Sequence, residues 1–365
     1  MSEKLNIVFV LAANSISPTG GFRIIAGYAD RLQARGHQVT LIAPGGVRKR
    51  PHSLRARVME LLYRVTRPRR EGTPFLKNPG VRVVTVPGVD KLAPEHFPQA
   101  DVLIATWWET AEWIAPAPGA VKLHFVQGHE AFPYLPLERV RAVYRMPSPK
   151  IVVSQWLQSK MAEYGGGDCV IVENAVDMAE FSRGEGKKPA RPTVGFAYSL
   201  ATVKNSALAI EACRRLRALY PDLRVVAFGS HRPRASDNMP PWIEYSVYPS
   251  ADKIAELYGA CDAWLFTSDE EGYGLPILEA MAAGTPVVAT PAGAAPQLVT
   301  GENGALVEHD SADIAAAAAR IVNSSSEDWA AMSRAAAATA RAHNWDAATD
   351  QFEAALRAAL PPQNR

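Results

Sequence analysis

The chain has 365 residues, of which 48% are hydrophobic and 21% are charged, and its formal net charge at pH 7 is +2. These proportions are those of a globular protein with room for two domains, and they exclude a disordered chain. The sequence contains no apolar stretch long enough to cross a bilayer and does not begin with a signal-peptide pattern, so we expect a cytoplasmic protein. The three cysteines are widely spaced and indicate neither a disulfide framework nor a zinc site.

The first half of the chain alternates strands and helices. An apolar run at residues 5–11 has strand length, apolar residues at helical spacing follow at 22–35, and the next strand is predicted at 39–43. This order is a βαβ unit, which implies a parallel sheet that binds ligands at the carboxyl ends of its strands. The loop between the first strand and the helix lacks the Gly-x-Gly-x-x-Gly fingerprint, which argues against a nicotinamide or flavin enzyme. Further strands are predicted at residues 81–86, 102–106, 121–126 and 151–153.

The segment between Arg48 and Arg70 is strongly basic. It holds nine Lys or Arg residues against the single acid Glu60, and its apolar residues follow helical spacing. Two interpretations remain open: a basic amphipathic helix that contacts anionic lipid headgroups or an anionic acceptor, or a surface helix packed on its own domain. A nucleic-acid partner is not expected, because the segment stands alone and has no interleaved aromatic residues.

The second half of the chain repeats the alternation after a linker-like segment at residues 183–191, which contains Gly, Lys and Pro. From residue 314 onward the sequence is rich in alanine and mostly helical. The strands predicted in this half are 193–196, 224–228, 263–266 and 286–289, and the helices are 207–220, 253–258 and 276–283.

Residues 271–279 carry the clearest chemical signal. Seven residues separate Glu271 from Glu279. Between them, Gly274 permits a tight turn and Pro276 is suited to the first position of a helix. We therefore expect the backbone N–H groups of Gly274, Leu275 and Ile277 to face an anion such as a phosphate in front of that helix.

This stretch closely resembles the E-x7-E motif of retaining nucleotide-sugar glycosyltransferases of family 4, which have the GT-B fold. The segment from Asn174 to Asp177 is similar to the Asn-Gly-Val-Asp phrase that closes their first domain. The resemblance implies an α/β protein with two doubly wound Rossmann-like domains facing each other across a cleft. Residues 1–185 would form the acceptor domain, onto which the terminal helix at 345–365 crosses back, and residues 192–344 would form the donor domain.

The resemblance also implies roles for particular residues. Glu271 would bond sugar hydroxyls, Glu279 the ribose, and Lys204 the diphosphate. His129, in a polar loop after a strand, would lie against the sugar, whereas His124 is expected to be a satisfied core residue. The family's second phosphate-binding arginine is missing here, which leaves Ser199 or Lys204 alone in that role. The remaining expected donor contacts are Gly20 and Gly21 ahead of the first helix, Tyr273, and Tyr248 with Pro249 at the nucleobase.

The function expected from this resemblance is transfer of a sugar, with retention, from a nucleotide-diphosphate sugar to a hydroxyl acceptor. No Asp-x-Asp or His-rich pattern suggests a metal, and no cofactor is expected. The segment from His124 to Glu130 looks like that of bacterial enzymes that add rhamnose or similar sugars to surface polysaccharides or glycolipids. The alternatives are a sugar phosphorylase of the same fold and a sugar-binding protein without catalysis.

Overall fold

The computed structural model describes residues 3–13, 20–46, 76–184 and 186–362. The basic segment between Arg48 and Arg70 lies outside these ranges, so its two interpretations stay open. Contacts divide the chain into two compact units. The first comprises Met1–Ile151, Met161–Val170 and Thr349–Arg365, and the second comprises Val152–Lys160 and Ile171–Ala348. The domain limits at residues 185 and 192 stay a prediction.

The first sheet has seven strands in the order β3-β2-β1-β4-β5-β6-β7. β1 pairs in parallel with β2 on one side and β4 on the other, where Ile7 lies opposite Val39 and Val102. Its strands are β1 (Asn6–Val10), β2 (Gln38–Pro44), β3 (Arg82–Val86), β4 (Val102–Ala105), β5 (Val121–Val126), β6 (Lys150–Val152) and β7 (Cys169–Ile171). The helices between them are α1 (Gly20–Ala34), α3 (Trp108–Ile114), α4 (Leu137–Tyr144) and α5 (Gln155–Glu163), and α6 (Met178–Phe181) follows β7.

The core of the first unit includes the end of the chain. Phe352, in α13 (Trp345–Ala359), is fully buried.

 The exposed fraction of Phe352 is 0%. Its ring stacks on Tyr28 of α1 with 4.2 Å between the ring centroids, and it meets Phe125 of β5 edge to face at 5.2 Å. These contacts are why the chain from Thr349 onward groups with the first unit.

The second sheet has six strands in the order β10-β9-β8-β11-β12-β13, and every neighbouring pair is parallel. Its strands are β8 (Thr193–Ala197), β9 (Arg224–Gly229), β10 (Ile243–Val247), β11 (Ala263–Phe266), β12 (Val287–Ala289) and β13 (Gly304–Leu306). Its helices are α7 (Ser206–Leu219), α8 (Ala251–Gly259), α9 (Leu275–Ala282), α10 (Ala295–Leu298), α11 (Ser311–Val322) and α12 (Ser326–Ala342).

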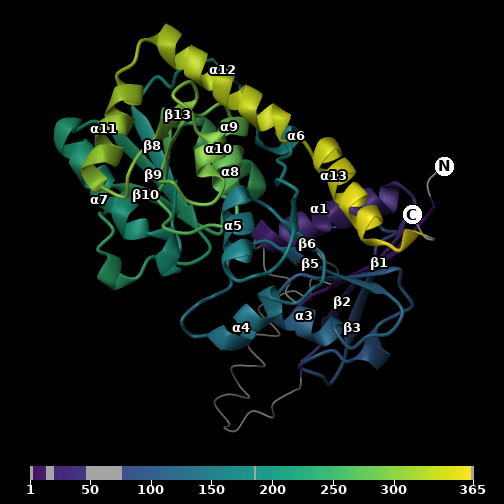
Figure 1. The fold of residues 1–365 in the computed structure, drawn as a ribbon. Coiled ribbons are helices and arrows are strands. Elements are labelled where there is room, and N and C mark those ends of the chain that lie inside the picture. Colours follow the sequence, from purple (N-terminus) through teal and green to yellow (C-terminus); the bar gives the residue numbers. More distant parts are fainter. Residues whose placement is uncertain (1–2, 14–19, 47–75, 185, 363–365) are drawn as a thin grey trace, which may run out of the picture. The chain divides into compact units, whose positions relative to one another are not determined.

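Helices cover both faces of the second sheet. Figure 1 shows α7 and α11 together on one face, and α8 and α9 on the other. The buried residues Ile210 of α7 and Ile314 of α11 share one apolar core with Leu265 of β11. The expectation of two doubly wound α/β domains is therefore confirmed.

Two local expectations were wrong, and one strand was not expected. Gly20 and Gly21 are the first two residues of α1 rather than part of a loop ahead of it. Helix α9 begins at Leu275, which puts Pro276 at its second position. The short strand β13 was not expected, because three residues give too little periodicity to detect.

Candidate active site

The candidate site lies where the strand order of the second sheet changes direction. The chain runs from β8 outward to β9 and β10, then returns to the other side of β8 and continues outward from β11. In open α/β sheets, ligands bind at the carboxyl ends of the strands at such a switch point. Binding groups are therefore expected in the loops after β8 and β11.

The loop after β8 ends in a short 3-10 turn, Thr202–Lys204, that places Lys204 just ahead of α7. Asn205 follows in the left-handed conformation (φ 44°), which asparagine tolerates better than most residues. Its side-chain oxygen accepts the N–H of Leu208 at 3.2 Å and so caps α7. Its amide nitrogen donates to Asp269 Oδ1 at 2.8 Å, which ties this loop to the loop after β11.

The two loops bring Lys204 and Glu271 together. The Lys204 ammonium donates a hydrogen bond to Glu271 Oε1, although the two residues are 67 positions apart. Ser268 Oγ donates to the same carboxylate oxygen at 3.1 Å. The side chain of Glu271 is 11% exposed and that of Lys204 is 36% exposed. A cation and an acid thus meet at the switch point, partly shielded from water.

The start of α9 lies beside this pair. Gly274 precedes the helix with φ 105°, and a Cβ there would come within 3.1 Å of Phe266 Cζ and 3.2 Å of Ile277 Cδ1. Gly274, as the residue before the helix, has no side chain with which to cap it. The expected role of Ile277 was wrong, because its N–H donates to the Gly274 carbonyl at 2.9 Å. The backbone amides of Gly274 and Leu275 stand at the positive end of the helix dipole, and their role toward an anion stays a prediction.

The loop that carries Glu271 is held by its neighbours. Gly293 has φ 61°, and a Cβ at this position would lie 2.7 Å from the Tyr273 carbonyl oxygen and 2.8 Å from Glu271 Cβ. The N–H of Ala294 donates to the same carbonyl at 2.8 Å. Tyr273 as a whole is 2% exposed, so its ring is buried and its expected contact with the donor stays a prediction.

Glu279 is more deeply buried than its expected ribose-binding role suggests. The residue is 9% exposed, and Tyr258 Oη donates a hydrogen bond to its Oε2 at 2.9 Å. One carboxylate oxygen is therefore already engaged inside the protein. Tyr258 is a contact that the sequence pattern did not indicate, because it lies 21 residues away on α8.

Two other expected donor contacts, Ser199 and Tyr248, follow strands of the same sheet. Ser199 lies in the loop after β8, where its N–H donates to Ser206 Oγ at 3.0 Å. Tyr248, with Pro249 next to it, follows the edge strand β10, and its side chain is exposed. In addition, Arg234 Nη2 donates to the Leu200 carbonyl at 2.9 Å, which brings a cation to the loop where the family's arginine is missing.

In the first unit, His129 follows β5, and its ring is stacked on those of Tyr144 and Tyr164. Its Nε2 lies 2.9 Å from Tyr164 Oη, and its ring stacks on that of Tyr164 with 5.8 Å between centroids. Gly21, at the start of α1, lies against the side chain of Gln127, two residues before His129. The sequence analysis missed Tyr164, which lies 35 positions away.

Two buried titratable residues flank this loop. Burial raises the pKa of the Glu130 carboxyl well above its usual value, although its Oε2 accepts the N–H of Trp108 at 2.7 Å. Burial, helped by the charge of Lys150, lowers the pKa of His124 to about 3. His124 is a core residue as expected, but it is not satisfied, because neither ring nitrogen has a hydrogen-bond partner among the described residues.

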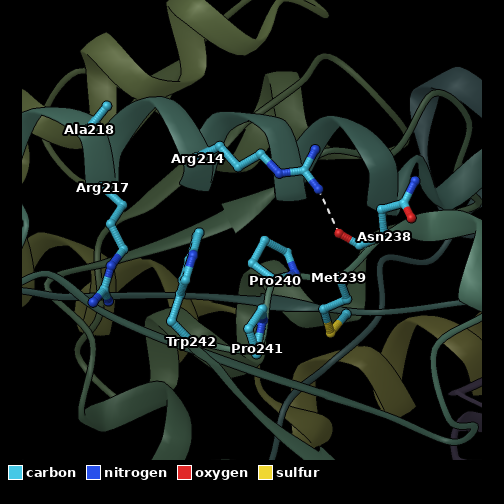
Figure 2. A pocket seen from close by; sticks show the side chains of 8 residues that line it. All are labelled: Arg214, Arg217, Ala218, Asn238, Met239, Pro240, Pro241 and Trp242. Atoms are coloured by element: carbon cyan, nitrogen blue, oxygen red, sulfur yellow. Dashed lines mark hydrogen bonds between the residues drawn. The ribbon is translucent and has the colours of Figure 1, made fainter.

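A cavity of about 670 Å³ lies away from the candidate site. Figure 2 shows Arg214 and Arg217 of α7 facing Trp242 and its neighbours, with the Arg217 guanidinium 5.0 Å from the centre of the Trp242 ring. These residues come from the C-terminal half of α7 and from the segment just before β10. They therefore lie at the amino-terminal edge of the sheet, opposite to Lys204 and Glu271.

The part of the chain that the structure describes contains neither a metal-binding cluster nor a membrane-spanning helix. Within residues 3–13, 20–46, 76–184 and 186–362, no three His, Cys, Asp or Glu side chains gather in a way that could hold a metal ion. None of the helices in these same ranges is long and apolar enough to cross a membrane.

Comparison with known proteins identifies the class to which this fold and site belong. Residues 18–180 match the model of Glycosyltransferase Family 4, and residues 191–324 match that of Glycosyl transferases group 1. The chain therefore belongs to the glycosyltransferases that these two models describe, and its fold is GT-B.

Similar proteins agree with this family. The D-inositol 3-phosphate glycosyltransferase of Segniliparus rotundus is 28% identical over 214 residues, which are 52% of this chain and 47% of that protein. The match thus spans about half the length of the curated relative. The solved sucrose-phosphate synthase of Thermosynechococcus elongatus has a TM-score of 0.73 at 16% identity, covering 96% of this chain and 98% of that one. Anabaena HepE in complex with UDP-glucose has a TM-score of 0.71 at 17% identity, covering 97% and 100%.

Proposed function

We propose that this protein is a retaining glycosyltransferase that moves a sugar from a nucleotide-diphosphate sugar to a hydroxyl acceptor without a metal ion. The observation that carries the proposal is the Lys204–Glu271 ion pair beside the start of α9, which Gly274 precedes. A cation, two helix-end amides and a carboxylate converge there at the switch point of a doubly wound sheet.

These groups suit the departure of a nucleoside diphosphate. As the bond between sugar and phosphate breaks, negative charge grows on the leaving diphosphate and positive charge grows on the sugar ring. Fixed hydrogen-bond donors and cations stabilise the first charge, which is the role we assign to Lys204 and the amides of Gly274 and Leu275. The carboxylate of Glu271 would bond sugar hydroxyls and stabilise the second.

The remaining roles extend the same scheme. Glu279 would receive the ribose hydroxyls, and His129, in the first unit, would contact the transferred sugar. Retention requires no dedicated base in this scheme, because the leaving phosphate can take the proton of the acceptor hydroxyl. The donor carries a nucleoside diphosphate, as does the UDP-glucose bound to HepE.

The acceptor side of the proposal concerns the basic segment. Nine Lys or Arg residues between Arg48 and Arg70 would attract an anionic membrane surface if the acceptor is carried on a lipid. Co-sedimentation with vesicles of phosphatidylglycerol, compared with vesicles of phosphatidylcholine, tests this part. Equal sedimentation with both would contradict it.

The experiment that tests the function offers the protein UDP-, GDP-, dTDP- and ADP-linked sugars with simple hydroxyl acceptors, with and without EDTA. We expect release of one nucleoside diphosphate, unchanged by EDTA, and a product whose anomeric configuration by NMR matches that of the donor. Turnover of sugar phosphates in their place would identify a phosphorylase. Donor binding in calorimetry without turnover of any acceptor would indicate a sugar-binding protein.

A further inference from the structure

The main-chain carbonyl of Ser268 is held by two side chains that lie outside the motif at residues 271–279. Thr290 Oγ1 donates a hydrogen bond to this oxygen at 2.7 Å, and His309 Nε2 lies 3.1 Å from it. Thr290 directly follows β12 and is fully buried, whereas His309 lies in the segment after β13, and its side chain is 35% exposed. The next two strands along the sheet from β11 thus each lead to a residue that binds the loop after β11.

The His309 ring is the donor in its contact with Ser268. A carbonyl oxygen can only accept a hydrogen bond, so Nε2 of His309 carries a proton. This holds for the neutral ring, in which Nδ1 then carries none, and for the charged ring, in which both nitrogens carry one. The same Nε2 lies 3.7 Å from Asp269 Oδ1. Both of these oxygen atoms belong to the loop after β11, so the ring is oriented toward that loop.

Ser268 connects this carbonyl to Glu271. Its Oγ donates to Glu271 Oε1 at 3.1 Å, and the same carboxylate oxygen accepts the Lys204 ammonium. Ser268 is 4% exposed, so water competes little for its hydroxyl. The place of that hydroxyl depends on the main chain of Ser268, which Thr290 and His309 hold at the carbonyl. A carboxylate that must keep one orientation in a reaction depends on supporting contacts of this kind.

We propose that His309 is a positioning residue that fixes the main chain of Ser268 and, through the Ser268 hydroxyl, the carboxylate of Glu271. In this role His309 acts from behind the site and contacts neither the donor nor the acceptor. Its effect on the position of Glu271 is a property of the second unit alone. Its contribution to sugar transfer rests on the proposed function of the protein.

The position of Glu271 can be followed on the protein without substrate. Protein labelled with ¹³C at the glutamate carboxyl carbons gives a signal for Glu271 that is assigned by its loss in Glu271→Gln. We expect this signal to move in His309→Met and to return in His309→Gln. Methionine has nearly the reach of histidine but no donor, whereas the amide nitrogen of glutamine lies as far along the side chain as Nε2 and can donate.

The matched control is His231→Met, the same substitution at an exposed histidine after β9 of the same sheet. It should leave the Glu271 signal in place. The signals of the other glutamates show whether each variant is folded. An unchanged Glu271 signal in His309→Met, or a displaced signal that glutamine does not restore, would overturn the proposal. These outcomes do not depend on turnover, so they are distinct from a failure of the proposed function.

A kinetic comparison then tests the positioning role. We expect His309→Met to lower kcat about three- to tenfold, the effect of losing one ordering hydrogen bond, with little change in the KM for the donor. His309→Gln should keep most of the wild-type kcat. An unchanged kcat in His309→Met would show that this restraint is not used in the reaction, which would overturn the positioning role.

A double-mutant cycle tests whether His309 acts through Ser268. Ser268→Ala removes the hydroxyl that reaches Glu271 but keeps the carbonyl that His309 binds. We therefore expect His309→Met to lower kcat much less in the Ser268→Ala background than in the wild type. Fully additive effects of the two substitutions would overturn the proposed route through Ser268.

Discussion

At the scale of single residues, Lys204 is the group whose removal tests the site most directly. Lys204→Ala removes the cation nearest to the proposed diphosphate and leaves Glu271 with Ser268 as its remaining hydrogen-bond donor at this oxygen. We expect kcat/KM to fall about a hundredfold or more, with weaker donor binding. The control is Lys253→Ala, which breaks an exposed ion pair with Glu256 on α8. An unchanged kcat/KM in Lys204→Ala would refute the assignment.

Substitutions of the two glutamates of the motif are expected to change different kinetic parameters. Glu271→Gln keeps the shape of the side chain but removes the charge that would stabilise the sugar ring, so kcat should fall about a hundredfold while donor affinity changes little. Glu279→Ala should mainly weaken donor binding. Steady-state kinetics and calorimetry with the same nucleotide sugar separate the two effects.

The buried contact of Glu279 requires its own control. Glu279→Ala also removes the hydrogen bond from Tyr258, so part of its effect comes from local packing. Tyr258→Phe removes that hydrogen bond and keeps the carboxylate. If Tyr258→Phe lowers donor affinity as much as Glu279→Ala does, Glu279 supports the helix rather than the ribose.

At the scale of elements, the start of α9 depends on Gly274. An alanine there would force a non-glycine residue to φ 105° and bring its Cβ within 3.1 Å of Phe266. We expect Gly274→Ala to lower the free energy of unfolding by about 1 to 3 kcal/mol and to weaken donor binding, because the amides at the helix start would shift. Thermal unfolding and donor titration measure the two effects.

The matched control for this element is Gly301→Ala. A Cβ at Gly301 would have nothing within 4 Å, and no left-handed conformation is required there. This variant should bind the donor like the wild type. If Gly274→Ala binds the donor equally well, the helix start is not part of the site.

The sequence predicted the strands and helices that a local pattern of apolar residues determines. It did not predict the contacts between side chains in the site. Apolar runs marked most strands within one or two residues, since burial on both faces of a parallel sheet demands them. The pairing of Lys204 with Glu271 depends on which strands become neighbours, and no local pattern contains that information. The same holds for Tyr164 beside His129. The missing partners of His124 could not be predicted either, because satisfaction of a buried group depends on side chains from other elements.

At the scale of the whole molecule, both sheets follow the same order from the third to the first strand and then outward from the fourth. Each sheet therefore has a switch point at its first strand, and the residues of chemical interest in each unit lie in loops at the carboxyl edge. In the first sheet this edge carries His129, and in the second it carries Lys204 and Glu271. The repeated topology therefore brings two unrelated sequence segments to the carboxyl edges of their own sheets.

The free energy of unfolding of the whole molecule should depend on pH through one buried residue, His124. The pKa of His124 is about 3 in the folded protein and about 6.5 in the unfolded chain. Between these values the unfolded state binds a proton that the folded state does not, so the free energy of unfolding decreases as the pH falls. The decrease is about 1.4 kcal/mol per pH unit, or about 2 kcal/mol between pH 7 and pH 5.

His124→Phe isolates this contribution. Phenylalanine keeps a ring against Tyr144, whose centroid lies 6.2 Å away, and it introduces no group that needs a hydrogen bond. Glu130 and Asp262 act in the opposite sense, because burial raises their pKa values and the folded state then binds the extra proton. Both groups remain in the variant, so their contributions cancel when it is compared with the wild type.

Urea unfolding at pH 7 and pH 5 provides the measurement. The wild type should lose about 2 kcal/mol more than His124→Phe between the two pH values. His231→Phe, a substitution of an exposed histidine in the second unit, should lose as much as the wild type. Equal losses in His124→Phe and the wild type would mean that His124 takes up a proton in the folded protein, which its burial beside the Lys150 ammonium opposes.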